Sequence, residues 1–218
     1  MRLLLFIFLI GSSFAKEGNF INPVISGAHP DPSICRVGDD YFIVNSSFEY
    51  FPGLPIHHSK DLVNWELIGY GLHRKEQCTG NMNLLDVQSD GGIHAPTIRY
   101  NKGVFYIITT NVYAPKDRAP GLMRNFVITA KDPKGPWSDP HIIDGAPGID
   151  PDIFFDTNGK VYFTGTHSPG DNTSNGIGEI WVQELDIQNW ELKGERKTVW
   201  NGVFGCCTEG PHIYKENG

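Results

Sequence analysis

The sequence predicts an all-β protein of the β-propeller type, with about three four-stranded blades and the first strand of a fourth. A motif in which a polar or ionisable residue precedes Pro-x-Ile occurs four times, with prolines at 32, 96, 151 and 211. The steps between these prolines are 64, 55 and 60 residues, and this self-similarity is typical of repeat architectures. The 25 Gly, 15 Pro and 12% aromatic residues suit short strands joined by tight turns.

The first unit contains four predicted strands, at residues 33–36, 41–44, 56–59 and 65–68. Turn residues separate them: Gly-Asp-Asp at 38–40, Pro-Gly at 52–53 and an Asp-headed turn at 61–64. Short β-prone stretches bounded by Gly, Pro and Asp are the expected signature of strands. Four strands in a unit of about 60 residues describe one propeller blade.

The second and third units repeat this plan. Their predicted strands lie at 97–100, 105–109 and 126–129, with a fourth from Trp137, and at 153–155, 161–164, 180–183 and 190–192. An Asp-headed turn precedes Trp65, Trp137 and Trp190 in corresponding places, so we expect the Asp to cap its turn and the Trp to pack in the core. The fourth copy, at 208–213, predicts the opening strand of another blade.

The repeated motif also predicts a site. The first strand of a propeller blade lies innermost, so residues at its start converge on one end of the central axis. The equivalent positions are predicted to be Asp31, His94, Asp150 and Glu209. Asp152 instead aligns with Ser33, Thr97 and His212, one residue after the proline, and is therefore the less favoured catalyst.

Three carboxyl groups in one pocket indicate a particular chemistry. Like charges at close range raise the pKa of at least one group, which allows a protonated acid to face an ionised base at neutral pH. Glycoside hydrolysis uses a carboxyl pair in this way. Each acidic residue taken alone could equally shape a turn or cap a strand, and the equivalence across the repeats is what favours a site.

The motifs together resemble the family-43 glycoside hydrolases, five-bladed β-propeller enzymes that include β-xylosidases and α-L-arabinofuranosidases. The resemblance covers about residues 21–218. It rests on His29-Pro30-Asp31-Pro32-Ser33, Gly38-Asp39-Asp40-Tyr41, Ser47-Phe48-Glu49-Tyr50-Phe51-Pro52-Gly53, Ile56-His57-His58-Ser59-Lys60-Asp61-Leu62, Gly92-Ile93-His94-Ala95-Pro96, Gly148-Ile149-Asp150-Pro151 and Thr208-Glu209-Gly210-Pro211-His212.

The resemblance implies roles for individual residues. Asp31 would be the general base, Glu209 the general acid, and Asp150 the residue that tunes the acid's pKa and helps to position substrate. Inversion at the anomeric centre would place Asp31 and Glu209 roughly 6.5–9.5 Å apart, with a water between them. Phe48 matches an aromatic residue beside the sugar subsite. His94, where several relatives carry Trp, would form another part of the pocket wall.

The resemblance also implies what lies beyond this chain. Five blades of this size need roughly 300 residues, so we expect a fragment of a longer gene product or a truncated one. The absent blades would carry a central His, often beside a structural calcium, and no cofactor is required. Pentose-containing plant polysaccharides or oligosaccharides are the implied substrates. The alternative is a non-catalytic carbohydrate-binding propeller or an inactive truncated fragment.

The N-terminus predicts a secreted protein. Arg2 precedes an apolar run at 3–10, and small residues at Ser13 and Ala15 fit cleavage of a signal peptide of residues 1–15. The run is too short to span a bilayer, so residues 16–218 would form the mature propeller domain without a membrane anchor. The net charge of −7 argues against nucleic acid or an anionic membrane as a partner.

Secretion would permit disulfides and glycans. The cysteines are Cys35, Cys78, Cys206 and Cys207, and two bridges would allow three connectivities that the sequence does not rank. Neither the cysteines nor the histidines have the spacing of a zinc site, and no metal ligand is predicted. Asn45 and Asn172 begin glycosylation sequons.

Overall fold

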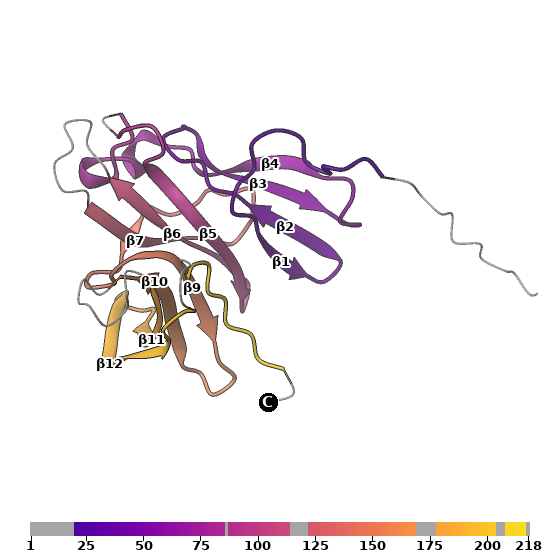
Figure 1. Ribbon diagram of the computed structural model, residues 1–218. Coiled ribbons are helices and arrows are strands. Elements are labelled where there is room, and N and C mark those ends of the chain that lie inside the picture. Colours follow the sequence, from indigo (N-terminus) through magenta and orange to yellow (C-terminus); the bar gives the residue numbers. More distant parts are fainter. Residues whose placement is uncertain (1–19, 86, 114–121, 169–177, 204–207, 217–218) are drawn as a thin grey trace, which may run out of the picture.

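Three antiparallel four-stranded sheets make up the computed structural model, which describes residues 20–85, 87–113, 122–168, 178–203 and 208–216 (Figure 1). The first sheet contains β1 (Ser33–Val37), β2 (Asp40–Val44), β3 (Gly53–Ser59) and β4 (Glu66–Leu72). The second contains β5 (Gly92–Asn101), β6 (Val104–Tyr113), β7 (Leu122–Ala130) and β8 (His141–Ile142). The third contains β9 (Ile149–Phe155), β10 (Val161–His167), β11 (Glu179–Asp186) and β12 (Glu191–Trp200). Two short 3₁₀ helices, η1 (Lys75–Gln77) and η2 (Gly80–Met82), link the first two sheets.

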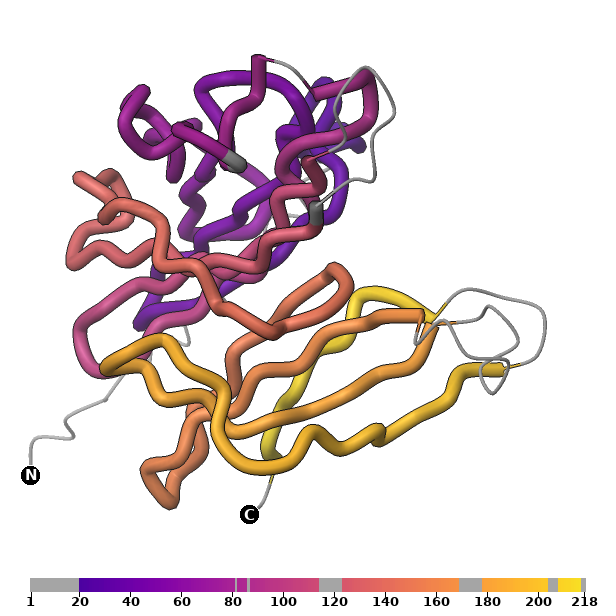
Figure 2. The backbone as a smooth tube through the Cα atoms, turned by 90° about the vertical axis from the view of Figure 1, so that its left-hand side faces the viewer, coloured from indigo at the N-terminus to yellow at the C-terminus, as the bar shows by residue number. Residues whose placement is uncertain are grey.

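Each sheet corresponds to one predicted unit, and its strands are ordered as in the chain. The first strands β1, β5 and β9 lie next to one another in that order. Figure 2 shows the second sheet between the first and the third. The prediction of an all-β protein built from blade-like sheets is therefore confirmed.

The second sheet is buried on both faces, because side chains of adjacent residues in a strand point to opposite faces. Ile107 of β6 packs into a core shared with the first sheet, whereas the next residue, Ile108, packs into a core shared with the third. In β7, Phe126 and Val127 are divided in the same way. One unit alone would expose such faces, and stacking the units buries them.

The tryptophans only partly follow the prediction of core packing. Trp137 is 1% exposed and lies in the core between the first two sheets. Trp190 is half-buried against the second core and stacks on His141. The prediction is wrong for Trp65, which lies outside both cores, because its indole N–H is held by the Leu62 carbonyl within its own turn.

The Asp-headed turns are as predicted. The Asp61 carboxylate accepts the backbone N–H groups of Val63 and Asn64, at 2.9 and 2.7 Å. Asp132 and Asp186 each accept the backbone N–H two residues further on. These bonds satisfy backbone donors that no strand partner reaches.

Two predicted strands differ in the structure. The fourth strand of the second sheet begins at His141 rather than at Trp137 and has only two residues. The intervening backbone bonds elsewhere: Ser138 N–H donates to the Thr129 carbonyl, and prolines at 136 and 140 have no N–H. The opening strand predicted at 208–213 lies in segment 208–216, which is extended but belongs to none of the sheets. Side chains of the third sheet bond its backbone N–H groups instead.

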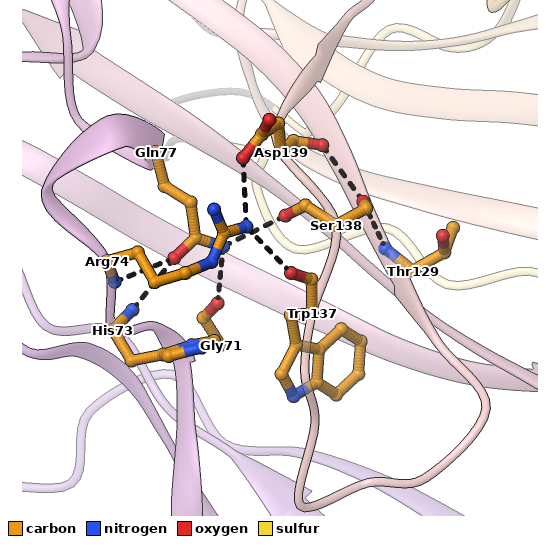
Figure 3. Close-up of polar contacts among 8 residues, drawn as sticks. All are labelled: Gly71, His73, Arg74, Gln77, Thr129, Trp137, Ser138 and Asp139. Atoms are coloured by element: carbon orange, nitrogen blue, oxygen red, sulfur yellow. Dashed lines mark hydrogen bonds and ion pairs between the residues drawn. The ribbon is translucent and has the colours of Figure 1, made fainter.

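Gln77 joins the first sheet to the second (Figure 3). Its side-chain oxygen accepts the N–H groups of His73 and Arg74, each at 3.0 Å, and its nitrogen donates to the Gly71 and Ser138 carbonyls. Beside it, the Arg74 guanidinium donates to the Trp137 carbonyl and to Asp139. Since Gln77 is 1% exposed, this bonding is what makes the burial of an amide tolerable.

Several sequence predictions fall on residues outside the described ranges. They concern the signal peptide at residues 1–15, the sequon at Asn172, and Cys206 and Cys207. Cys35 and Cys78 are half-buried free thiols and are not bonded to each other, and burial raises the pKa of both. Within the described ranges no helix has the length and apolar character needed to cross a membrane.

Candidate active site

The four motif prolines share an unusual backbone conformation just before them. The preceding residues Asp31, Ala95, Asp150 and Gly210 have φ values of 50°, 42°, 56° and 62°, in the left-handed region. This conformation is uncommon for a residue with a side chain. It corrects the predicted register: Asp31 and Asp150 are equivalent, whereas His94 and Glu209 each lie one residue earlier in their copies.

The left-handed residues interrupt the pairing of the first strands. The ladder between β5 and β6 shifts between His94 and Thr97, and the ladder between β9 and β10 shifts between the pairs formed by Ile149 and Asp152. A bulge of this kind bends a strand and redirects a side chain, and bulges are frequent beside functional sites. The repeated proline therefore marks the point at which each first strand turns its side chains into a shared cavity.

This cavity, of about 580 Å³, lies where the starts of β1, β5 and β9 meet the segment around Gly210. All five residues predicted for the site line it: Asp31, Phe48, His94, Asp150 and Glu209. They come from all three sheets or the loops beside them and from the last described segment. The fold thus brings together residues up to 178 positions apart, 209 minus 31, and their individual roles remain predictions.

Asp31 is held by a serine that the sequence patterns did not identify. Ser46 Oγ lies 2.5 Å from Asp31 Oδ2 and 2.6 Å from the backbone nitrogen of Ala95. Because the Ala95 N–H donates to this hydroxyl, the hydroxyl proton is directed to the carboxylate. Ser46 is buried, so it fixes one oxygen of Asp31 against the neighbouring blade.

Asn45 supports the same turn from behind. Its side-chain nitrogen donates to the carbonyls of His29 and Pro30, at 2.9 and 3.1 Å. Asn45 is 1% exposed and its side-chain nitrogen is occupied, so the folded chain does not present this glycosylation sequon to solvent. A signal for both residues was present: in the predicted hairpin, the polar residues after strand 41–44 must lie beside the start of strand 33–36.

The surroundings of Asp150 in the cavity shift the pKa of its carboxyl group. Burial is the main cause that raises its pKa, and the negative charges of Glu209 and Asp31 raise it further. The Gly210 N–H, which donates to Asp150 Oδ2 at 2.9 Å, opposes the shift, as does His94. The predicted clustering of like charges therefore raises the pKa of Asp150, but burial raises it more.

This shift predicts how replacing Asp150 changes stability with pH. The folded-state pKa of Asp150 lies above the ordinary 3.8, so the protonated carboxyl group stabilises the folded chain relative to the ionised one. This contribution to stability is complete at low pH and is lost as the pH rises through the folded-state pKa. Asp150→Asn is therefore expected to be more stable than the wild type at pH 7, with the difference vanishing near pH 3. Urea unfolding at the two pH values measures this, and a difference independent of pH would contradict it.

Phe48 and His94 form one wall of the cavity. Their rings meet edge to face with centroids 4.9 Å apart. Reciprocal backbone hydrogen bonds, both 3.0 Å, fix Phe48 to Ile93 of β5. His94 Nε2 lies 2.9 Å from the Asp90 carbonyl oxygen, which can only accept, so Nε2 carries the proton. The wall is thus rigid and joins the first two blades.

Gly148, two residues before Asp150, has no room for a side chain. A Cβ there would lie 1.8 Å from the Thr166 carbonyl oxygen, and its φ is +80°. Gly148→Ala is expected to lower the free energy of unfolding by about 3 kcal/mol, from left-handed strain and overpacking. Gly159 has a similar φ of +86°, and a Cβ there would meet nothing within 4 Å, so Gly159→Ala is the matched control. Equal losses in urea unfolding would show that the close approach is not the cause.

The described residues contain no group of three or more His, Cys, Asp or Glu side chains arranged to hold a metal ion. The resemblance implies calcium beside a His of blades other than these three, and not in this cavity.

Comparisons with known proteins show the family to which this chain belongs. The family model described as Glycosyl hydrolases family 43 matches residues 20–218. A xylosidase/arabinosidase of Butyrivibrio fibrisolvens is 48% identical over 202 residues, which are 90% of this chain and 37% of that protein. A non-reducing end alpha-L-arabinofuranosidase of Bacteroides ovatus is 44% identical over 216 residues, 99% of this chain and 37% of that protein.

Solved structures give the same result. The crystal structure of a xylan beta-1,4-xylosidase from Bacillus halodurans is 37% identical, with a TM-score of 0.78, over 92% of this chain and 37% of that one. This chain therefore spans little more than a third of the length of these relatives. The described sheets superpose on part of a larger molecule.

Proposed function

Because this chain belongs to glycosyl hydrolases family 43, we propose that its complete gene product is a secreted glycosidase that releases xylose or arabinose from plant polysaccharides or oligosaccharides, with inversion at the anomeric carbon. The observation that carries the proposal is the shared cavity of Asp31, Asp150 and Glu209. The names of the similar enzymes support the pentose class of substrate. The pattern of residues 1–15 supports secretion.

Asp31 acts as the general base in this proposal. The Ser46 hydroxyl holds one of its oxygens, and the carboxylate keeps lone pairs that can take a proton from an attacking water. Glu209 acts as the general acid, protonating the glycosidic oxygen on the opposite side of the sugar. A water between them would attack the anomeric carbon directly, which produces inversion.

Asp150 supports the acid in two ways. It holds the backbone beside Glu209 through the Gly210 N–H, and its charge interacts with the charge of Glu209. The Phe48–His94 wall would face the sugar ring with an apolar edge and one fixed imidazole. Aromatic side chains suit the apolar faces of neutral sugars.

The test uses the complete gene product with 4-nitrophenyl β-xyloside and 4-nitrophenyl α-arabinofuranoside. Release of nitrophenol from one or both is expected, and NMR of the first sugar formed should show the anomer opposite to that of the substrate. Binding of pentose oligosaccharides without hydrolysis would overturn the enzyme proposal in favour of a carbohydrate-binding propeller. A first product with the substrate's own configuration would overturn inversion alone.

A further inference from the structure

The residue after each of the first three motif prolines makes a hydrogen bond from its side chain to the next unit. Ser33 Oγ accepts the backbone N–H of Ile98 at 3.1 Å, and Thr97 Oγ1 donates to the Pro151 carbonyl at 2.9 Å. At the third position, Asp152 Oδ2 accepts the backbone N–H of Ile213 at 2.9 Å. These bonds run from the first unit to the second, from the second to the third, and from the third to segment 208–216.

The third of these contacts, from Asp152, differs from the other two because its side chain is charged. Arg99 of β5 reaches across from the second sheet and binds both oxygens of Asp152, at 2.8 and 2.6 Å. Asp152 is 0% exposed. Its pKa is lowered: burial opposes the shift, but the neighbouring His212 ring and Arg99 outweigh it. A buried bidentate ion pair is stronger and more directional than the neutral hydrogen bonds made by Ser33 and Thr97.

Arg99 and Asp152 also bind the last described segment, which runs beside β9 in Figures 1 and 2. Asp152 bonds the Ile213 nitrogen, and an Arg99 nitrogen donates to the Ile213 carbonyl at 3.4 Å. The guanidinium also lies over the Tyr214 ring, 4.9 Å from its centroid. Residues 213 and 214 are thereby fixed to two blades at once.

Glu209 lies four residues before this anchor. On its near side, the Gly210 N–H is bound by Asp150, and on its far side the Thr208 carbonyl accepts the Thr166 hydroxyl. Thr208 is buried, whereas the Glu209 side chain is open to the cavity. The position of the Glu209 carboxyl group therefore depends on how firmly segment 208–216 is held.

We propose that Arg99 and Asp152 are positioning residues that hold segment 208–216 so that Glu209 can protonate the leaving group. This inference rests on the proposed function. The pair touches no reacting atom, since Arg99 and Asp152 do not line the cavity. This role explains why the residue after the motif proline is a carboxylate in the third blade, whereas it is Ser33 or Thr97 in the other two.

Asp152→Asn and Arg99→Lys test the proposal in the complete gene product, with dinitrophenyl and methyl glycosides of the sugar that the wild type cleaves. Dinitrophenolate departs with little help from an acid, whereas methoxide needs it. A displaced Glu209 should therefore reduce turnover of the methyl glycoside by about tenfold or more beyond the loss on the dinitrophenyl glycoside. A merely structural loss of folded enzyme would lower both by the same factor.

Amide hydrogen exchange over residues 208–216 gives a readout that needs no turnover. Both variants should exchange faster there. Arg74→Lys is the control, because Arg74 also joins two units through an Asp side chain and a backbone carbonyl, but at a place remote from segment 208–216 (Figure 3). Arg74→Lys should leave exchange at 208–216 and the ratio of the two substrates unchanged. Unchanged exchange in the Asp152 and Arg99 variants, or equal losses on both glycosides, would overturn the inference. A wild type without turnover would instead defeat the proposed function, and the exchange result would still decide whether the pair holds the segment.

Discussion

Replacing Glu209 with alanine is expected to slow hydrolysis of a methyl glycoside by about 10²–10⁴-fold, while a dinitrophenyl glycoside loses much less. The general acid is needed only in proportion to the basicity of the leaving group. Since the Glu209 side chain is exposed and lines the cavity, its removal should not disturb the fold. Steady-state kinetics on the two substrates gives the ratio directly.

Thermal unfolding of Glu209→Ala is the control for this experiment and should match the wild type. Glu216, in the same described segment and outside the cavity lining, supplies a second control, because Glu216→Ala removes the same charge without touching the site. If Glu209→Ala lost equal activity on both glycosides, the acid would have to be another residue.

Replacing Asp31 with asparagine should reduce hydrolysis of both glycosides by about the same large factor, about 10²–10⁴-fold. Activation of the attacking water is required whatever group leaves, so the quality of the leaving group should not compensate. Asparagine keeps the shape of the side chain, and its carbonyl oxygen can still accept the Ser46 hydroxyl. The left-handed turn tolerates asparagine better than most residues.

The contrast between the Asp31 and Glu209 variants is more informative than either alone. Asp31→Asn should keep wild-type affinity for a pentose product, which calorimetry can measure, because only the proton acceptor is lost. A loss on the methyl glycoside alone would assign Asp31 to the leaving group rather than to the water. Activity close to that of the wild type would remove Asp31 from the mechanism.

Much of the fold could be predicted from the chain because its units repeat. Strands 41–44, 56–59, 105–109 and 161–164 lie within β2, β3, β6 and β10, where β-prone residues alternate with turn residues. The pairing of first with second strands also follows, because the turns at 38–39 and 102–103 are too short for anything but antiparallel neighbours. The prediction of strand bounds was less accurate where turn residues interrupt the strand. β8 has only two residues, because prolines lie on either side of Trp137 and cannot donate a backbone hydrogen bond.

The candidate site was predictable in its carboxyl groups but not in their supports. Asp31, Asp150 and Glu209 carry the repeated proline motif, which is visible in one dimension. The register of the motif was nevertheless off by one at His94 and Glu209, because the left-handed residue before the proline is a property of backbone conformation. Ser46, Asn45 and Arg99 are not part of the repeated proline motif, and their contacts join positions 15 to 53 residues apart.

By itself, the sequence determined that this chain folds as stacked four-stranded units and that three acidic residues belong to one pocket, because both follow from a periodic pattern of residue types. Only the tertiary structure decided how the pocket is held. It places Ser46 on Asp31, buries Asp150, and pairs Arg99 with Asp152 near the segment that carries Glu209. These depend on distances between blades, and no local pattern in the chain encodes such distances.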